Sequence, residues 1–344
     1  MKRTFDIAAF CIYKSECWFF AKEFNCLFYK KIDSGNTAIC GPVPWEPEKK
    51  ELLYKEMEYV DGKLYLIPFR ARGIAVYDIA NKSYYKIELD AQMFSKGGNF
   101  FRAGLVYDKY IYAFGIHVPT IMVINTANDN VEYLTRWYEE VKEHLTNSSR
   151  ALFRKQLVVI GKMAYIPMAY GDIVLSICLE TKQVIVNYLK FKSTGYVGIT
   201  NDEENIYLAS RAGQGFIGCW NCNTKEEKVI GYLNQDGVEV NKYLAYISSI
   251  IEVYYMKYDR NKLSGENIHS AEYNCDCLLS NGYANAFFCD NGKVLLISNN
   301  DKRQIDISIE ITGEDERKIR ELNSFFKETK WYGIKQLIEE LVER

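Results

Sequence analysis

Short apolar runs separated by turn signals recur along this chain, and the segment 56–89 is the clearest example. It contains four such runs, EMEYV, KLYLIPF, GIAVYDI and SYYKIEL, which are separated by the turn signals DG, RAR and ANK. Val, Ile, Tyr and Phe are residues that pleated strands favour, and an Asp-Gly pair tolerates the positive φ of a two-residue hairpin turn. The pattern therefore predicts a small sheet of four antiparallel strands.

The second run of this segment is apolar on both of its faces. Leu64 and Leu66 belong to one face of the predicted strand, and Tyr65 and Ile67 belong to the other. A sheet with one wet face would alternate apolar and polar residues instead. We therefore expect each sheet to be covered by a neighbouring sheet on both sides.

Seven segments along the chain match this second run. Their starting positions are 40 to 53 residues apart, and a period of roughly 40–50 residues is typical of propellers built from four-stranded blades. The segments begin at Cys17, Leu64, Tyr110, Met163, Ile206, Val253 and Lys293.

The repeat predicts an all-β fold, namely a seven-bladed β-propeller of four-stranded antiparallel blades that spans residues 1–312. A six-bladed ring is the alternative, because the sixth unit, about 243–280, carries a polar insert at Asp259–Ser270. Propellers avoid exposed sheet edges by closing the ring, often with strands from both termini. The N-terminal segment Phe5–Ile12 is a candidate for that closure.

Two segments outside the predicted blades have a helical pattern. The sequence WYEEVKEHLTN, at about 137–147, predicts a short helix inserted after the third blade. Residues 313–344 predict an amphipathic helical tail, because Ile319, Leu322 and Phe326 recur at helical spacing. We expect the tail to pack on the propeller, and a docking or dimerisation helix is the alternative.

The segment 56–89 resembles the Kelch-type repeat. Its GKLY at 62–65 matches the GK-x-Y of the second Kelch strand, and its YD at 77–78 matches the end of the third. It departs from the family at two points: no Gly-Gly doublet follows the second strand, and Tyr85 stands in place of the Kelch Trp. The resemblance implies a propeller architecture for about 4–311 and assigns no ligand.

Composition narrows the classes of partner. Hydrophobic residues make up 48% of the 344 residues, which supports a large core, and the net charge of −2 provides no basic field for duplex nucleic acid. Asp6, Lys14 and Glu16 interrupt the N-terminal apolar stretch, so it does not match an export signal, and no apolar run is long enough to span a membrane. We therefore expect a cytoplasmic protein without nucleic-acid or membrane partners, whose ten cysteines are mostly reduced thiols.

Candidate binding residues gather in the loops of one predicted face. In a propeller, the loops from second to third strands and from fourth to next first strands open on the same face, where they vary without disturbing the blades. Arginine forks in such loops bind carboxylate or phosphate at two points. The alternative is that these arginines form rim salt bridges with nearby acids. The candidate ligand-binding residues are Trp45, Arg70, Arg72, Arg102, His117, Arg150, Tyr170 and Arg211.

No local signature of catalysis or metal binding accompanies these residues. Of the three histidines only His117 falls on the predicted face, and no nucleophile motif such as G-x-S-x-G is present. Cys219 and Cys222 form a C-x-x-C, but residues i and i+3 of a strand face opposite sides, which favours buried thiols over zinc or redox chemistry. We expect no catalytic residue, no metal and no cofactor.

The sequence therefore favours a non-catalytic binding or scaffold propeller. Its arginine-rich face would hold a partner protein or an anionic ligand, such as a small molecule, a glycan or an acidic peptide. The alternative is a carbohydrate-active hydrolase or lyase that acts on an anionic sugar at the same face. That alternative needs two carboxylates about 5–10 Å apart, and the candidates are Glu23, Glu56 and Asp172.

Overall fold

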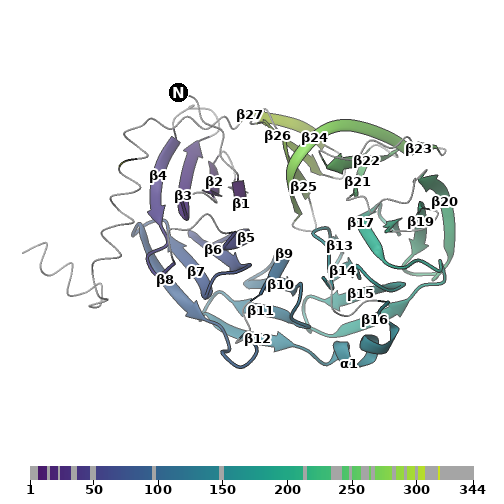
Figure 1. The fold of residues 1–344 in the computed structure, drawn as a ribbon, viewed down its shortest axis with the longest axis horizontal. Coiled ribbons are helices and arrows are strands. Elements are labelled where there is room, and N and C mark those ends of the chain that lie inside the picture. The colour runs from purple at the N-terminus through teal and green to yellow at the C-terminus, as the bar shows by residue number, and fades with distance from the viewer. Residues whose placement is uncertain are drawn as a thin grey trace, which may run out of the picture.

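The computed structural model is an all-β fold in which the sheets stand radially around a common axis (Figure 1). This arrangement agrees with the all-β, propeller-like prediction. The residues that the structure describes are 7–13, 16–21, 24–31, 37–46, 52–94, 98–146, 151–211, 215–233, 242–247, 250–256, 263–264, 268–280, 284–289, 293–298, 301–306 and 317.

Four of the sheets contain four antiparallel strands each, in sequence order. The first sheet consists of β1 (Ile7–Tyr13), β2 (Glu16–Ala21), β3 (Cys26–Lys31) and β4 (Thr37–Pro42). The second consists of β5 (Tyr54–Val60), β6 (Lys63–Pro68), β7 (Gly73–Asp78) and β8 (Ser83–Glu88). The third consists of β9 (Phe101–Tyr107), β10 (Tyr110–Gly115), β11 (Ile121–Asn125) and β12 (Asn130–Leu134). The fourth consists of β13 (Val158–Ile160), β14 (Met163–Pro167), β15 (Ile173–Cys178) and β16 (Val184–Tyr188).

The last two sheets depart from the four-stranded plan. The fifth sheet adds the two-residue strand β23 to the outer edge of an ordinary four-stranded unit, and the sixth contains six strands. The fifth consists of β17 (Tyr196–Asn201), β18 (Asn205–Ser210), β19 (Gly215–Asn221), β20 (Glu227–Leu233) and β23 (Leu263–Ser264). The sixth consists of β21 (Lys242–Ile247), β22 (Ile250–Met256), β24 (Ile268–Ser280), β25 (Ala284–Cys289), β26 (Lys293–Ser298) and β27 (Asp301–Asp306).

The sixth sheet explains why seven separate blades are not confirmed. The long strand β24 pairs in parallel with β22 through its first half and antiparallel with β25 through its second half. The sixth and seventh predicted units are therefore joined in one sheet, and the described strands form six sheets around the axis. The expected closure by Phe5–Ile12 is also not seen, because β1 pairs with β2 alone among the described strands.

The repeat located the second strand of each unit correctly. All seven predicted segments are strands, namely β2, β6, β10, β14, β18, β22 and β26. The predicted Asp-Gly hairpin is present too, since Asp61 and Gly62 have φ values of 46° and 80°.

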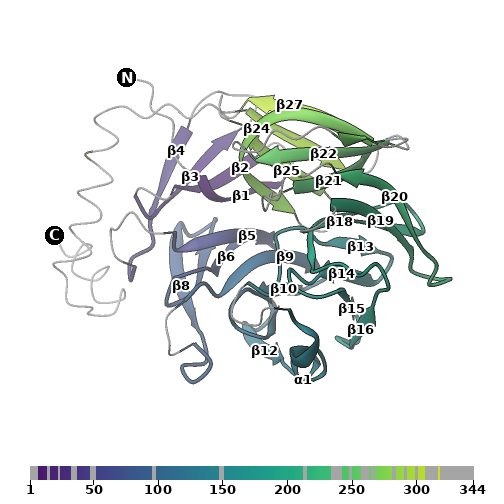
Figure 2. The same ribbon diagram turned by 45° about the vertical axis from the view of Figure 1, so that its right-hand side comes forward.

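The helical insert after the third sheet is shorter than predicted. It consists of α1 (Trp137–Val141) and the 3-10 helix η1 (Lys142–His144), and Trp137 anchors it by burying its ring. Figure 2 shows α1 beside β12, at the outer edge of the ring. Apart from Arg317, the predicted tail at 313–344 lies outside the described residues, so the tail and the 1–312 boundary stay predictions. No described helix has the length and apolar character that a membrane crossing needs.

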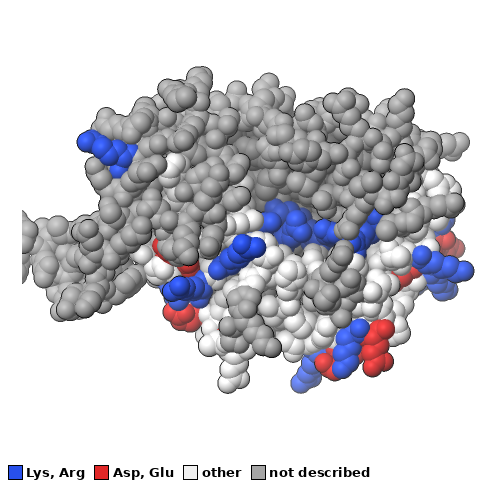
Figure 3. All heavy atoms as spheres, viewed as in Figure 1, with Lys and Arg blue, Asp and Glu red and all other residues white. Residues whose placement is uncertain are grey.

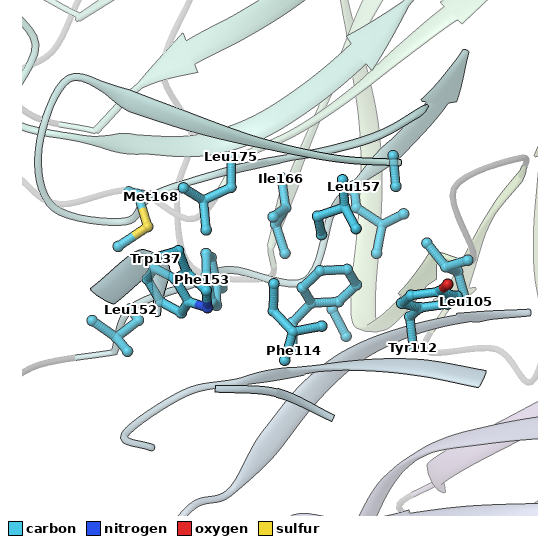
Figure 4. Packing of buried hydrophobic residues seen from close by; sticks show 14 of the residues in the cluster. Leu105, Tyr112, Phe114, Trp137, Leu152, Phe153, Leu157, Ile166, Met168 and Leu175 are labelled. Carbon is cyan, nitrogen blue, oxygen red and sulfur yellow. The ribbon is translucent and has the colours of Figure 1, made fainter. Parts of the chain in front are cut away.

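Apolar side chains fill the space between successive sheets. Leu64 and Leu66 pack between the first and second sheets, whereas Tyr65 and Ile67 pack between the second and third. Figure 4 shows the layer between the third and fourth sheets, where Phe114 faces side chains of the fourth sheet such as Ile166. The second, third and fourth sheets are thus dry on both faces, as the sequence pattern indicated.

Tyrosines in the second strands also join one sheet to the next. The Tyr112 hydroxyl donates to the Leu179 carbonyl, in the turn between β15 and β16, at 2.6 Å. Tyr65 makes the equivalent bond to Asp129, in the turn between β11 and β12, at 3.1 Å. The side chain of Tyr165 is hydrogen-bonded to Cys222, which follows β19. A repeated position in the strand therefore makes a repeated bond across the sheet boundary.

Gln156 joins three sheets near the axis. Its side chain is 1% exposed, and it lies just before β13. Its Oε1 accepts the backbone N–H of Leu244 at 2.9 Å and that of Ile199 at 3.3 Å, and its Nε2 donates to the Leu244 carbonyl at 2.9 Å. One amide thus satisfies backbone groups of β17 and β21 from the entry to the fourth sheet.

Replacing Tyr112 with Phe should destabilise the fold by about 1–2 kcal/mol, because the Leu179 carbonyl loses its buried donor. The matched control is Tyr110→Phe, since Tyr110 contacts Lys182 through its ring face, and it should cost no more than about 0.5 kcal/mol. Urea unfolding of both variants measures the difference. Equal costs for the two variants would contradict the role given to the Tyr112 hydroxyl.

Gln156→Glu should cost at least about 2 kcal/mol at pH 8, because a buried carboxylate would face the Leu244 carbonyl without a proton to donate. The cost should shrink at pH 5, where the carboxyl group binds a proton and becomes a donor. The control is Gln183→Glu, at an exposed position of the turn before β16. Unfolding free energies at both pH values test this, and a cost independent of pH would be unexpected.

Candidate functional site

A belt of backbone hydrogen bonds connects the loops of one face of the ring, which we call the loop face. The loop face comprises the connections from second to third strands and the segments that lead into first strands. Along the belt, hydrogen bonds that join two segments of the same sheet alternate with hydrogen bonds that join segments of two neighbouring sheets. They run from Phe100 N to Phe69 O, Ile116 N to Phe100 O, Leu152 N to Ile116 O, Ala169 N to Leu152 O, Tyr196 N to Met168 O and Arg211 N to Gly195 O, at 2.6–3.0 Å.

Glycine makes this close approach of backbones possible at two positions. At Gly195, whose φ is 138°, a Cβ atom would lie 2.1 Å from the Ala169 carbonyl oxygen. At Gly115 a Cβ atom would lie 2.0 Å from the Val118 carbonyl oxygen. No side chain fits at either distance, so the belt depends on glycine at two places: Gly195, where two loop segments cross, and Gly115, where the β10–β11 connection folds back on itself.

Arg70 lies at the boundary between the second and third sheets, on the loop between β6 and β7. Its side chain is exposed, and its Nε donates to Asn99 Oδ1 at 2.8 Å. The carbonyl of Asn99 accepts the backbone N–H of His117, an exposed residue that follows β10, at 3.4 Å. The ring of Phe69 lies beside this group, with the Lys55 Nζ 4.3 Å and the Arg70 Cζ 5.9 Å from its centroid. The loop face therefore gathers cationic and polar groups at this boundary.

Arg72 is exposed on the same loop as Arg70. Its backbone N–H donates to Glu46 Oε1 at 2.8 Å, which fixes the loop and leaves the guanidinium outside that contact. The neighbouring Trp45 is partly buried and meets the Tyr84 ring edge-on, with 6.4 Å between centroids. Trp45 thus packs against the second sheet.

Four charged side chains form an axial cluster that the sequence interpretation only partly anticipated. The cluster consists of Glu56 and Glu58 on β5, Arg102 on β9, and Lys155, which precedes β13. The Lys155 Nζ lies 3.7 Å from a Glu56 carboxylate oxygen, and both side chains are about 5% exposed. The Nε of Arg102 is buried and has no hydrogen-bond partner among the described residues.

Burial dominates the protonation of the two glutamates. Burial raises the pKa of Glu56 to about 8, although the cations Lys155, Lys55 and Arg102 act in the opposite direction. Burial, together with the charge of Glu56, raises the pKa of Glu58 to about 8 as well. Both acids therefore keep their protons to higher pH than ordinary glutamates do, which weakens the negative charge that they set against Lys155 and Arg102.

Arg211 and Tyr170 are occupied by contacts within the fold. Arg211 is 5% exposed, and its guanidinium lies 3.5 Å from the centroid of the Tyr170 ring, which is itself 8% exposed. The Arg211 Nη1 also donates to the Ala169 carbonyl at 3.4 Å. These two candidates pack on each other where the fourth and fifth sheets meet. Arg150 lies outside the described residues.

The rim salt bridges considered as the alternative are not seen for three of the arginines. No ion pair between described residues includes Arg70, Arg72 or Arg102. Figure 3 shows Lys and Arg atoms gathered near the middle of the ring, with no Asp or Glu atom visible among them. In the part of the chain that the structure describes, these arginines therefore keep their charge uncompensated by a directly paired acid.

The carboxylates proposed for a hydrolase are not brought together in the described structure. Asp172 is hydrogen-bonded to the Tyr196 hydroxyl and to the Ser193 backbone N–H, and burial raises its pKa. Glu56 belongs to the axial cluster and pairs with Lys155. Glu23 lies outside the described residues. Among the described residues, Asp172 and Glu56 thus have separate partners and do not form the carboxylate pair that this alternative needs.

The cysteine motif is built into the fifth sheet. Cys219 lies in β19 and Cys222 follows it, and both are free thiols. The Cys222 Sγ donates to the Glu204 carbonyl at 3.4 Å. The side chains of Cys275 and Cys277 lie outside what the structure describes. Among the described residues, no three His, Cys, Asp or Glu side chains are arranged to hold a metal ion.

Sequence comparison assigns no family to this chain. No protein-family model matches it, and no curated protein matches it.

Structural comparison finds similar folds at low sequence identity. The computationally designed Ika8 protein aligns with a TM-score of 0.50 and 12% identity over 90% of each chain. A chain of the mitotic checkpoint complex aligns with a TM-score of 0.52 and 10% identity, over 83% of this chain and 87% of that one. The WD40 repeats of RRP9 align with a TM-score of 0.49 and 12% identity, over 84% and 88%.

At these identities the likeness concerns the fold alone. The alignments at TM-scores of 0.50 and 0.52 show that this chain shares its overall fold with solved proteins, and its own four-stranded antiparallel sheets stand radially around one axis. The Kelch-type resemblance of the sequence is not confirmed by any of them. We conclude that the chain has a propeller-like repeat fold.

Glu58→Gln tests the buried acids through their pH dependence. The pKa of Glu58 is about 8 in the folded protein and about 4.3 in an unfolded chain. The stabilisation that the neutral Glu58 carboxyl group provides is therefore complete at pH values below the pKa of the unfolded chain, and it is lost as the pH rises through the folded-state pKa of about 8. Between these values we expect the free energy of unfolding to fall by up to about 1.4 kcal/mol per pH unit, and Glu58→Gln to remove part of that slope.

Urea unfolding at a series of pH values from 5 to about 8.5 measures this slope. The control is Glu143→Gln, because Glu143 is exposed on η1. A wild-type slope unchanged by Glu58→Gln would contradict a raised pKa at that position.

Proposed function

We propose that this protein is a non-catalytic binding or scaffold protein that holds an anionic ligand on its loop face. The ligand class comprises small oxyanions, anionic glycans and acidic peptides. The residues that contact it are Arg70, Arg72, Arg102 and His117, and Lys55 is added to the residues proposed from the sequence.

The observation that carries this proposal is the state of the arginines. Arg70 and Arg72 are exposed on one loop, and neither forms an ion pair with a described acid. A protein that used these residues for rim stability would be expected to pair them with carboxylates. Unpaired guanidinium groups held on a fixed backbone are suited instead to bind a carboxylate or phosphate from solution.

The axial cluster also favours an anionic ligand over a cationic one. Burial raises the pKa values of Glu56 and Glu58, which weakens the negative charge that these acids set against Arg102 and Lys155. Positive potential from the axis therefore adds to that of Arg70 and Arg72 and favours anions over cations at this face. Arg211, Tyr170 and Trp45 contribute to the fold around the site, since Arg211 packs on Tyr170 and Trp45 packs against Tyr84.

Thermal-shift measurements with inorganic phosphate, citrate, glucuronate and poly-glutamate test this function. A ligand present at about 100 times its Kd stabilises the folded state by about 2.7 kcal/mol, which corresponds to a rise of a few degrees in Tm. We expect at least one of these probes to produce such a rise. The double variant Arg70→Ala/Arg72→Ala should abolish it.

The matched control is Arg136→Ala, because Arg136 is an exposed arginine at the start of α1, away from the loops that carry Arg70 and Arg72. The control should keep the full rise in Tm. If no probe raises Tm, or if the double variant responds like the wild type, the proposed site is wrong.

A further inference from the structure

We propose that Asn99 holds the Arg70 side chain in an orientation in which the two terminal nitrogens of Arg70, Nη1 and Nη2, donate to two oxygens of one carboxylate or phosphate group. This inference rests on the proposed function, and it specifies which group of the ligand the loop face recognises. Asn99 is a positioning residue, since it acts on the ligand through Arg70.

The geometry assigns separate tasks to the two edges of the guanidinium. The side edge, at Nε, donates to Asn99 Oδ1 at 2.8 Å. Because that bond is the one hydrogen bond that the described structure gives to the Arg70 side chain, Nη1 and Nη2 remain available. These two nitrogens form a planar fork that matches two oxygens of a carboxylate or phosphate.

The orientation is supported from two further directions. Phe69 lies beside the guanidinium, with 5.9 Å between the Arg70 Cζ and the ring centroid. Asn99 is itself fixed, because its carbonyl accepts the His117 N–H at 3.4 Å and the next residue, Phe100, belongs to the belt. An exposed arginine normally loses freedom of rotation about several side-chain bonds when it binds a ligand. An arginine that is already held in place therefore binds at lower entropic cost.

His117 extends the recognition site from the third sheet. The backbone N–H of His117 donates to the Asn99 carbonyl, and the His117 side chain is exposed. Lys55 contacts the same Phe69 ring as Arg70, so it places a second cation in this part of the loop face. The site therefore fits an oxyanion that carries more than one acceptor oxygen, with the two-point contact at Arg70.

The experiment compares binding of pyrophosphate and citrate to four variants by isothermal titration calorimetry. Arg70→Lys keeps the charge and loses the fork, so we expect it to weaken binding about tenfold or more. Asn99→Ala keeps Arg70 and releases its Nε, so we expect a loss of roughly threefold to tenfold. Asn81→Ala is the control, because Asn81 bonds Asp78 in the turn between β7 and β8, and it should bind like the wild type. Arg70→Ala gives the full loss.

A second measurement reads the position of Arg70 without a ligand. In the nitrogen–proton spectrum, the Arg70 Nε–H should exchange slowly with water in the wild type, and this protection should disappear in Asn99→Ala. Loss of protection without loss of affinity would limit Asn99 to a structural role and overturn the inference.

The outcomes separate this inference from the function on which it rests. If the wild type binds a probe and Arg70→Lys binds it equally well, the two-point contact is wrong while anion binding at the loop face stands. If the wild type binds neither pyrophosphate nor citrate, the inference is wrong, and the proposed function is decided separately by the Tm shifts with phosphate, glucuronate and poly-glutamate. Weaker binding in both Arg70→Lys and Asn99→Ala, with Asn81→Ala unchanged, is the result that supports it.

Discussion

The belt of backbone hydrogen bonds on the loop face is the constraint on which the candidate site depends. It ties the end of a second strand to the start of a first strand, within one sheet and then across to the next, from Phe69 to Arg211. Buried backbone groups must be paired, so these bonds fix where each loop leaves the ring. Arg70, Asn99 and His117 are immediate neighbours of belt residues, and their positions follow from it.

The axis and the spaces between sheets have opposite character. Apolar layers separate successive sheets, and the hydroxyls of Tyr65 and Tyr112 reach across these layers to the turns of the next sheet. The axis instead buries Glu56, Glu58 and Lys155, which is costly for charged groups. Since the layers between sheets supply stability, the axis can retain charged groups, among them the cations Lys155 and Arg102.

The sequence predicted the repeated parts of this fold well and its irregular parts poorly. The double apolar faces of Leu64–Ile67 predicted stacked sheets, because burial on both sides leaves a simple pattern. The blade count was not predictable in the same way, since β24 changes from a parallel partner to an antiparallel one within a single strand. No local pattern marks such a change, because it depends on which strands lie on either side.

The site was predictable as a set of loops and not as a set of contacts. The repeat register placed Arg70, Arg72 and His117 on one face, where the structure also has them. It could not show that Arg211 stacks on Tyr170, since that contact joins residues of two sheets. It also could not show that Arg70 donates to Asn99 or that Glu56 pairs with Lys155, because each contact joins residues that are far apart in the sequence. Native-state hydrogen exchange at the amides of Phe100, Leu152 and Tyr196 tests the central claim most directly. If the belt holds the loop face, these amides should exchange only through global unfolding, with opening free energies like those of β6 and β10, whereas exchange as fast as that of the exposed turn at 80–82 would contradict it.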